Sequence, residues 1–354
     1  MTRIVVVALD QLARPQPGGV ATYVRGLLGG LAEVAPQDEI VGLVPRGGVS
    51  VAPARPRPVA LDVRVLTRLW GRWPVGVPDN ADVVHGPSLA GPYGGGRRDA
   101  IHSVAVHDLL WRDAPEASTR AGVRFHEGRL RRLRSLDDVR VVCSAPGLRS
   151  RLVAEGIAAT RIHPVRLGVD ETTPEADPAH VARLLDAHGV SGPYVLYAGT
   201  REPRKNIERL VAAHRVARRR APDLGPLVIA GPPGWGEVDL GDAVVLGLVE
   251  RSILLGLYRR AGVVAYVPLA EGWGLPAVEA LARGTRVVAS TTTPSVEGNA
   301  AVRRVDPLDV EGIAAALVAS LDDPDDESAR ARRRDSVAEL TWRQCALDHL
   351  AAWR

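Results

Sequence analysis

The sequence contains few cysteines and almost no lysine. Only Cys143 and Cys345 are cysteines, and they lie far apart, with no Cys-x-x-Cys pattern or Cys/His cluster around them. This spacing predicts neither a disulfide framework nor a structural zinc site. Lysine occurs once, as Lys205, and every other base among the 45 is arginine. A single ammonium group therefore stands out in an arginine-rich chain.

Long apolar runs and a secretory leader are also missing. No uninterrupted apolar stretch is long enough to span a bilayer, so no membrane-spanning segment is predicted. Residues 1–8 run at once into a short β-branched stretch and lack the charged start and longer apolar core of a signal peptide. We therefore expect a cytoplasmic protein. The formal charge of +4 is modest and is only a weak argument for a polyanionic partner.

The length and the order of apolar segments predict two α/β domains. At 354 residues the chain exceeds the usual size of a single core. Residues 4–9 form an apolar stretch followed by a turn-rich segment and then by apolar residues at helical spacing, which is a strand, loop and helix unit. Similar short strands are predicted at residues 40–44, 83–85, 104–107 and 141–144. Strands that alternate with helices indicate a parallel sheet.

The alternation restarts after a polar segment that ends near residue 175. We therefore predict one doubly wound domain over residues 1–170 and a second over 171–339. The strands expected in the second domain are residues 194–198, 227–230, 243–246, 263–267 and 286–289. The Pro/Arg-rich stretch 51–58 is predicted to be a surface loop. In such sheets ligands bind beyond the carboxyl ends of the strands.

The most informative motif is Glu-Gly-Trp-Gly-Leu-Pro-Ala-Val-Glu at residues 271–279. It follows a predicted strand, and Pro276 suits the first turn of a helix. Gly272 and Gly274 allow backbone N–H groups to approach a ligand, and the start of the helix favours a phosphate. A carboxylate accepts well from paired hydroxyl groups, so Glu279 suits a ribose and Glu271 a transferred sugar.

A second motif places two bases before a helix. The strand at residues 194–198 ends at Gly199, and Arg204 and Lys205 then precede a helix for which Asn206 is a good N-cap. An arginine fork and a lysine point charge at this position suit the two phosphates of a nucleoside diphosphate. With the helix starts they would offset the charge of the leaving group, so no metal is expected.

Weaker signals accompany these motifs. The strand at residues 227–230 also ends in a glycine loop at Gly231, and the segment that contains Val249 and Leu254 suits the wall around a flat base.

Together these segments resemble glycosyltransferase family 4. The resemblance runs nearly end to end and is strongest over residues 194–290. It implies the GT-B fold, in which two Rossmann-like domains face a central cleft. It also implies that Arg204 and Lys205 bind the diphosphate and that Glu271 and Glu279 are the paired glutamates of the family. The remaining donor-binding positions that it implies are Gly18, Gly19, Gly199, Thr200, Gly231, Val249, Leu254, Gly272, Trp273, Gly274 and Leu275.

The same resemblance assigns roles outside the second domain. His107 falls at a position that lines the acceptor side near the anomeric carbon and is grouped with Arg204, Lys205 and Glu271 as catalytic. The helix at residues 340–354 is expected to pack back on the first domain, with its tryptophans in packing roles. Two departures are visible: Thr200 stands where many members have arginine, so that the phosphate-binding arginine is Arg204 or Arg201, and Trp273 replaces the commoner phenylalanine.

The reaction implied is the transfer of a hexose from a nucleotide sugar to an acceptor hydroxyl with retention of configuration. Residues 200–206 and 107–111 resemble bacterial surface-polysaccharide mannosyltransferases, which favours GDP-mannose as the donor. The acceptor would be a glycan or a lipid-linked glycan, with peripheral contact at the inner face of the membrane through the basic stretch 124–134, which includes Arg129. A solvated basic face explains this stretch equally well.

Other functions are compatible with parts of the sequence. A UDP-sugar-dependent transferase of the same fold and a sugar-nucleotide epimerase remain alternatives. A nicotinamide-dependent dehydrogenase is disfavoured because residues 4–20 contain no Gly-x-Gly-x-x-Gly turn. Asp323-Pro324-Asp325 matches the Asp-x-Asp motif of metal-dependent transferases, but it follows a helix and reads as a solvated acidic turn. A nucleic-acid binder would have to rely on the basic stretch alone.

Overall fold

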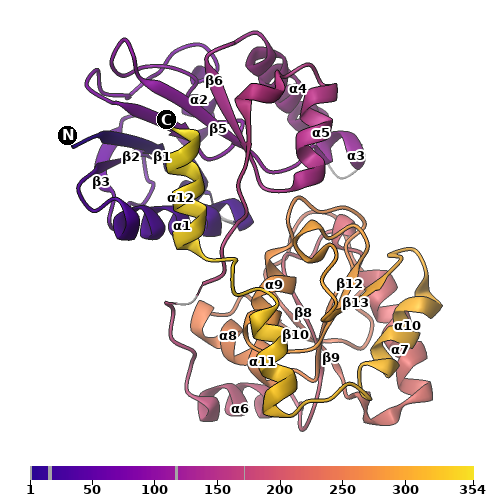
Figure 1. Ribbon diagram of the computed structural model, residues 1–354. Helices are drawn as coiled ribbons and strands as arrows, with labels where there is room; N and C mark the ends of the chain where they lie inside the picture. Colours follow the sequence, from indigo (N-terminus) through magenta and orange to yellow (C-terminus); the bar gives the residue numbers. More distant parts are fainter. Residues whose placement is uncertain (1, 15–17, 116–118, 171) are drawn as a thin grey trace. The chain divides into compact units, whose positions relative to one another are not determined.

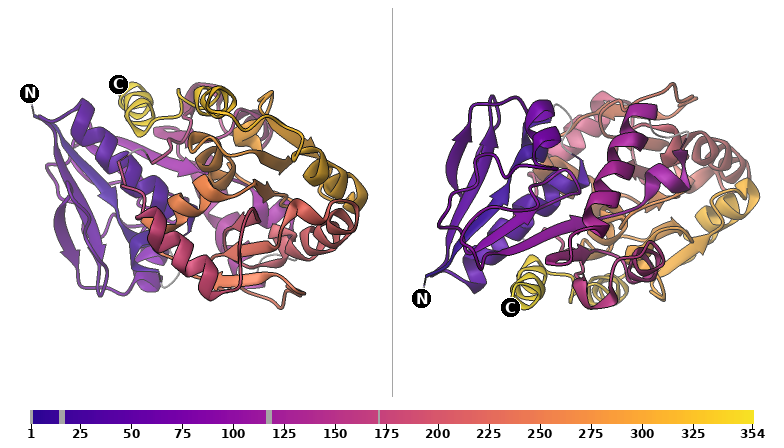
Figure 2. Two further views of the ribbon diagram at one scale, coloured as in Figure 1. Left: turned by 90° about the horizontal axis from the view of Figure 1, so that it is seen from below. Right: turned by 90° about the horizontal axis from the view of Figure 1, so that it is seen from above.

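A computed structural model describes residues 2–14, 18–115, 119–170 and 172–354. The chain forms two compact units (Figure 1). Unit 1 holds the chain up to Gly168 and also Leu340–Arg354, and unit 2 is Val169–Glu339. The boundary predicted from the sequence was residue 170. Each unit is built on a parallel sheet flanked by helices, which Figure 2 shows in two further directions.

Unit 1 contains a seven-stranded sheet in the order β3-β2-β1-β4-β5-β6-β7, with every neighbouring pair parallel. Its strands are β1 (Ile4–Ala8), β2 (Glu39–Pro45), β3 (Arg55–Val59), β4 (Val83–Gly86), β5 (Ile101–Val106), β6 (Val139–Cys143) and β7 (Ile162–Pro164). Its helical segments are η1 (Asp10–Ala13), α1 (Gly19–Val34), α2 (Val63–Leu69), α3 (Leu110–Asp113), α4 (Arg120–Arg134), α5 (Pro146–Ala154), η3 (Ala159–Arg161) and α12 (Trp342–Ala352). The central strands are buried, because helices cover them.

The stretch 51–58 is not wholly a loop, which corrects the prediction. Residues 55–59 form β3, the strand at one edge of the sheet, parallel to β2. Pro56 and Pro58 lack an N–H group, but an edge strand needs donors only toward its one neighbour. The two prolines take the positions whose nitrogen points away from β2, so the strand forms despite its composition.

The last helix returns to unit 1. In Figure 1 α12 lies beside α1, and the ring of Trp342 rests against Gly26, where an added Cβ would lie 2.0 Å from a ring atom. At the other end of α12 Trp353 is buried, and its indole N–H donates to the hydroxyl of Ser103 in β5 at 2.8 Å. Both tryptophans therefore serve packing.

A chain of buried polar groups joins α12 to this sheet. The Tyr23 hydroxyl lies 2.8 Å from Nε2 of His85 and 2.7 Å from Nε2 of His349. Nδ1 of His85 lies 2.8 Å from the Ser103 hydroxyl, and Nδ1 of His349 donates to the carbonyl of Cys345 at 2.8 Å. These side chains are almost wholly buried, so each polar atom needs the partner it has.

Unit 2 contains a six-stranded sheet in the order β10-β9-β8-β11-β12-β13, again with parallel neighbours. Its strands are β8 (Val195–Ala198), β9 (Leu227–Ala230), β10 (Val244–Gly247), β11 (Val263–Tyr266), β12 (Val287–Ser290) and β13 (Val302–Val305). Its helical segments are α6 (Pro178–Ala187), η4 (Pro203–Lys205), α7 (Ile207–Arg220), η5 (Pro222–Leu224), α8 (Arg251–Arg260), α9 (Leu275–Ala282), η6 (Pro294–Val296), α10 (Val310–Ala319) and α11 (Glu327–Asp335).

Both cysteines are buried and free. Within the described residues, no helix has the length and apolar character that crossing a membrane requires.

Candidate active site

The two sequence motifs of unit 2 meet at the carboxyl edge of its sheet. β8 and β11 are neighbouring parallel strands, so the loop after β8, which carries Arg204 and Lys205, lies beside the loop after β11, which carries Glu271. The N–H of Leu269 donates to the carbonyl of Arg204 at 2.9 Å, which fixes the two loops together. This is the edge at which α/β sheets bind ligands.

Lys205 and Glu271 form a buried ion pair. The Lys205 ammonium donates to Oε2 of Glu271 at 2.5 Å and to the hydroxyl of Tyr266 at 2.8 Å. The Tyr266 hydroxyl donates to the same carboxylate oxygen, and Arg204 reaches it at 3.3 Å. The side chains of Lys205 and Glu271 are only 10% and 12% exposed. Three donors thus converge on one oxygen.

The charges in this cluster hold Glu271 ionised. Burial alone would raise the pKa of the Glu271 carboxyl, but Lys205 and Arg204, with the hydrogen bonds from Lys205 and Tyr266, bring that pKa to about 2. Arg204 also donates to Glu202 at 2.5 Å. Two carboxylates therefore balance the two bases that the sequence analysis assigned to a diphosphate, a pairing that was not predicted.

Asn206 does not cap α7 with its side chain, which corrects the prediction. It occupies the N-cap position with φ 61°, the single non-glycine residue with positive φ in the described part of the chain. Its amide instead donates to the carbonyls of Val267 at 2.9 Å and Pro307 at 2.7 Å. A left-handed asparagine stores strain that the surrounding structure must hold. Asn206 therefore anchors the loop that presents Lys205.

The glycines of the strand ends allow close backbone approach. At Gly231, after β9, φ is 149° and an added Cβ would lie 2.0 Å from the carbonyl oxygen of Gly199, after β8. The carbonyl of Thr200 accepts from the Tyr197 hydroxyl at 2.9 Å, and the Tyr197 ring stacks on Tyr266. Gly199, Thr200 and Gly231 thus lie beside the ion pair.

The glycine turn before α9 is built as predicted, with one difference. Gly274 is the N-cap of α9 with φ 100°, Leu275 is the first helical residue, and a Cβ at Gly274 would lie 2.5 Å from Thr293. The N–H of Gly272, however, donates to Oε1 of Glu271 at 3.1 Å. Trp273 is buried, and its indole nitrogen has no partner within the described residues.

Glu279 belongs to a separate buried cluster. Its carboxylate accepts from Arg251 at 2.8 Å and from the Tyr258 hydroxyl at 3.2 Å, and its side chain is 6% exposed. Arg251 also reaches Asp170 at 3.2 Å. Arg251, the first residue of α8, lies between the predicted base-contacting positions Val249 and Leu254, which are partly buried. Arg251 was not among the predicted site residues, although a base two residues after Val249 was a usable signal.

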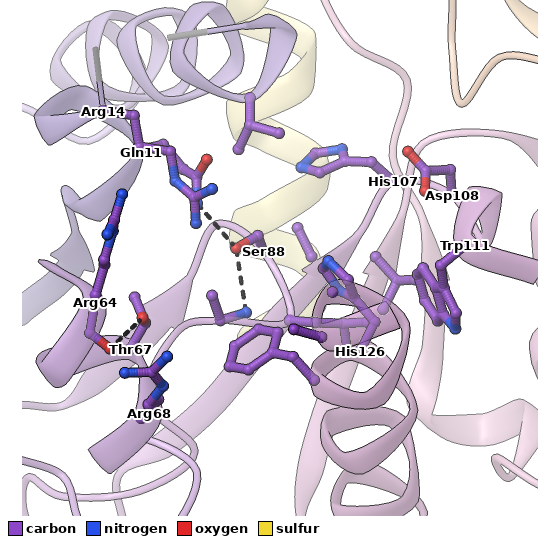
Figure 3. Close-up of a pocket in the computed structure, with 18 of the residues that line it drawn as sticks. Gln11, Arg14, Arg64, Thr67, Arg68, Ser88, His107, Asp108, Trp111 and His126 are labelled. Atoms are coloured by element: carbon purple, nitrogen blue, oxygen red, sulfur yellow. Dashed lines mark hydrogen bonds between the residues drawn. The ribbon is translucent and has the colours of Figure 1, made fainter. Parts of the chain in front are cut away.

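The remaining predicted residues lie in unit 1. Gly18 is the exposed N-cap of α1 and Gly19 its first residue. His107 follows β5 and lines a pocket of about 720 Å³ (Figure 3). Its Nε2 donates to the carbonyl of Pro87 at 2.9 Å, and burial lowers its pKa. The His107 ring is therefore neutral and keeps Nδ1 as an acceptor.

Arg129 is not part of an exposed basic face, which corrects the interpretation of residues 124–134. It is 5% exposed, donates to the carbonyls of Leu89 and Gly91, and stacks over the Tyr93 ring at 4.1 Å. Arg124, Arg131, Arg132 and Arg134 of the same helix are exposed.

The Asp-x-Asp match is occupied by ion pairs. Asp323 pairs with Arg303, and Asp325 with Arg330 and Arg333, in a turn that is exposed at residues 324 and 325, as predicted. Over the described residues, no group of three or more His, Cys, Asp or Glu is arranged to hold a metal ion.

Comparison with known proteins identifies the class. A model of the family described as glycosyl transferases group 1 matches residues 192–323. O-antigen chain mannosyltransferase B of Escherichia coli is 30% identical over an aligned length of 288 residues, and the alignment covers 77% of this chain and 74% of that protein. MMP α-(1→4)-mannosyltransferase of Mycolicibacterium hassiacum is 25% identical, covering 98% of this chain and 97% of that protein.

Solved structures agree in fold. Sucrose-phosphate synthase from Thermosynechococcus elongatus superposes with a TM-score of 0.76 at 20% identity, covering 100% of this chain and 98% of that one. Anabaena HepE in complex with UDP and glucose gives 0.67 at 12% identity, covering 99% and 98%. The fold is GT-B, and the protein is a glycosyltransferase. The chain belongs to the glycosyl transferases of group 1.

Proposed function

We propose that this enzyme is a family 4 transferase that moves mannose from GDP-mannose to an acceptor hydroxyl with retention of configuration. The observation that carries the proposal is the buried cluster of Arg204, Lys205 and Glu271 beside the glycine turn that opens α9. Two cations and a helix start at one sheet edge suit a diphosphate, and a carboxylate within 2.5 Å of the ammonium suits a sugar hydroxyl.

The chemistry follows from these charges. As the bond from the anomeric carbon to the diphosphate breaks, negative charge grows on the leaving oxygen, and Arg204 and Lys205 stabilise it. The acceptor oxygen attacks from the same face, and its proton passes to the departing phosphate. The products are the glycoside and the nucleoside diphosphate. Because protein cations supply the countercharge, the reaction needs no metal.

Before the donor binds, the two bases are already neutralised by Glu271 and Glu202. We infer that the incoming diphosphate takes over contacts with Lys205 and Arg204 and releases Glu271 toward the sugar. Glu279, with Arg251 beside it, then accepts from the ribose.

The choice of mannose as the sugar is supported by the relatives of this chain. O-antigen chain mannosyltransferase B, MMP α-(1→4)-mannosyltransferase and phosphatidyl-myo-inositol mannosyltransferase are all relatives of this chain. UDP-sugars remain the alternative donors, and a glycan or lipid-linked glycan is the proposed acceptor, with peripheral contact at the inner membrane face.

The experiment compares thermal shifts with GDP, UDP, ADP and TDP and then determines the anomeric configuration of the product by NMR. We expect the largest shift with GDP, a smaller one in a Glu279→Gln variant, and a retained configuration. An exposed carboxylate variant, Glu297→Gln, is the control. Equal shifts for all four nucleotides would remove the donor assignment, and an inverted product would remove the mechanism.

A further inference from the structure

The pocket of unit 1 has an arginine side. Arg14 follows η1, and Arg64 and Arg68 lie one helical turn apart on α2, so that all three reach the same lining. Figure 3 shows them on one side of the pocket and His107, Asp108, Trp111 and His126 on the other. The pocket therefore has a cationic side opposite a side of rings.

None of the three arginines forms an ion pair within 4.0 Å of a carboxylate among the residues that the structure describes, although the charge of Arg14 acts on the buried Asp10. Nearby arginines differ: Arg112 pairs with Glu127 and Glu155, and Arg151 with Asp113. Guanidinium groups that face a concave surface and contact no carboxylate keep their donors for an anion.

The carboxylates near the pocket do not cancel this charge. Asp108 is the single carboxylate in the described lining, lies on the opposite side, and accepts from the Leu110 N–H at 3.0 Å. Asp62 caps α2 by accepting from the Arg64 N–H at 2.8 Å. Asp10 is fully buried, and burial raises its pKa although the charge of Arg14 and the hydrogen bond from Gln11 act in the opposite direction. The lining thus keeps an excess of positive charge.

The backbone adds to the same potential. Thr119, Ala121 and Gly122 at the N-terminus of the 15-residue helix α4 also line the pocket. A helix start carries a partial positive charge, which favours an anion nearby. Trp111 and Phe125 supply flat apolar surface in the same lining. Such surface suits the ring of a sugar.

We propose that the acceptor of this transferase carries a phosphoryl group, which Arg14, Arg64 and Arg68 bind, while its sugar lies toward His107. This inference rests on the proposed function, because it takes the pocket of unit 1 as the acceptor site. A phosphate monoester has a charge of about −1.5 to −2 and three acceptor oxygens, enough for several guanidinium forks, whereas one arginine satisfies a carboxylate. The phosphoryl group belongs either to a soluble sugar phosphate or to a lipid-linked sugar diphosphate.

The test measures initial rates of the full chain with two pairs of acceptors. The soluble pair is mannose 6-phosphate and mannose, and the lipid pair is a polyprenyl diphosphate-linked hexose in detergent and the corresponding alkyl hexoside. We expect one phosphorylated acceptor to have a kcat/KM at least tenfold above its neutral partner. The pair that shows the preference identifies the source of the phosphoryl group.

Variants connect the preference to the arginines. Loss of a charge-assisted hydrogen bond weakens binding by roughly tenfold or more, so Arg64→Gln with Arg68→Gln should raise the KM for the phosphorylated acceptor about 100-fold. The KM for the donor should not change. The matched control is Arg218→Gln with Arg219→Gln, two exposed arginines of α7. A preference that survives the Arg64/Arg68 variant would overturn the proposal, as would equal use of phosphorylated and neutral acceptors.

A binding measurement separates this inference from the proposed function. Calorimetry with inorganic phosphate, after saturation with nucleoside diphosphate, should detect binding to the wild type that the Arg64/Arg68 variant lacks. Transfer to neutral acceptors without phosphate binding would leave the function standing and remove the inference. Arginine-dependent phosphate binding by a chain that binds no nucleotide would remove the proposed function, and with it the acceptor role of the pocket, and would leave only an anion site at the arginines.

Discussion

Lys205, the single lysine of the chain, belongs to the buried ion pair of unit 2. Its ammonium lies between the Tyr266 hydroxyl and the Glu271 carboxylate, with the Tyr266 ring centre 5.2 Å away. An ammonium is compact and directs its donors around one point, whereas a guanidinium is a planar fork. In a chain whose other bases are all arginine, this site has a shape that explains a lysine.

We predict that Lys205→Arg keeps the charge but loses the function. The larger group should displace Glu271 and lower the affinity for the donor nucleotide at least tenfold. The turnover rate should fall by about two orders of magnitude, because electrostatic stabilisation depends on position. Calorimetry and initial rates measure both effects. Arg219→Lys on α7 is the reverse exchange at an exposed site and should change neither. Wild-type kinetics in Lys205→Arg would mean that charge alone suffices.

For individual residues, the sequence predicted which residues belong to the site better than it predicted which of them contact one another. The spacing of strand, glycine and helix placed Arg204, Lys205 and Glu271 at sheet edges, and the parallel order of β8 and β11 brings them into contact. Nothing in the local pattern indicated that Glu202 and Tyr266 complete the cluster, or that Asn206 uses its side chain on Val267 and Pro307. Several of those contacts depend on segments 61 to 101 residues away.

Among the elements, the pairing of α1 with α12 has the most specific chemistry. The polar chain fixes its own protons: Trp353 donates to Ser103, Ser103 to His85, His85 to Tyr23, and Tyr23 to His349, whose Nδ1–H goes to the carbonyl of Cys345. Every donor meets an acceptor only if both imidazoles are neutral. Burial lowers the pKa of His85 well below its ordinary value and that of His349 to about 4.

We therefore predict a loss of stability in mild acid. Between pH 6.5 and 4 the His349 side chain is protonated in the unfolded chain but neutral in the native protein. The free energy of unfolding therefore falls as the pH falls through this range. His349 alone should contribute a loss of about 3 kcal/mol by pH 4. Urea unfolding at several pH values measures it. His349→Gln should flatten the dependence by that share, and the exposed His180→Gln should not. If the free energy of unfolding of His349→Gln depended on pH as steeply as that of the wild type, a neutral native His349 would be contradicted.

Helices and strands could be predicted from the sequence where their apolar residues lie on one face or run without interruption. The apolar strands of both sheets lie where their sequences indicate, because parallel strands covered on both faces are apolar throughout. β3 and β13 were missed for the opposite reason. β3 reads Arg-Pro-Arg-Pro-Val and β13 reads Val-Arg-Arg-Val, because both are edge strands with one open side.

In the whole molecule, unit 1 is formed from two separate stretches of the sequence, because the last residues of the chain belong to it. Its sheet is complete by residue 164, yet α12 supplies Trp353 and His349 to its interior after all of unit 2 has intervened. The stability of unit 1 thus depends on residues from both ends of the sequence, while unit 2 is formed from one continuous stretch.

We predict that a chain ending at residue 339 keeps a folded unit 2 and loses unit 1. Removing α12 uncovers α1 and takes away His349 from the Tyr23 hydroxyl and Trp353 from the Ser103 hydroxyl, a loss comparable to the roughly 5–15 kcal/mol total stability of an ordinary domain. Hydrogen exchange should show amides of β1, β4 and β5 unprotected, and those of β8, β9 and β11 protected, with nucleotide binding retained. Removal of Arg354 alone is the control. Equal protection of both sheets in the truncated chain would refute this dependence.

The two prolines of β3 have a consequence beyond the sheet that contains them. An exposed strand normally presents a row of unpaired donors and acceptors to which an extended segment of another molecule can attach. Along this border the outward nitrogens belong to Pro56 and Pro58, and arginines flank them. A foreign strand would find acceptors without donors along this border. Unit 1 is therefore protected on this border against polymerisation through shared sheets.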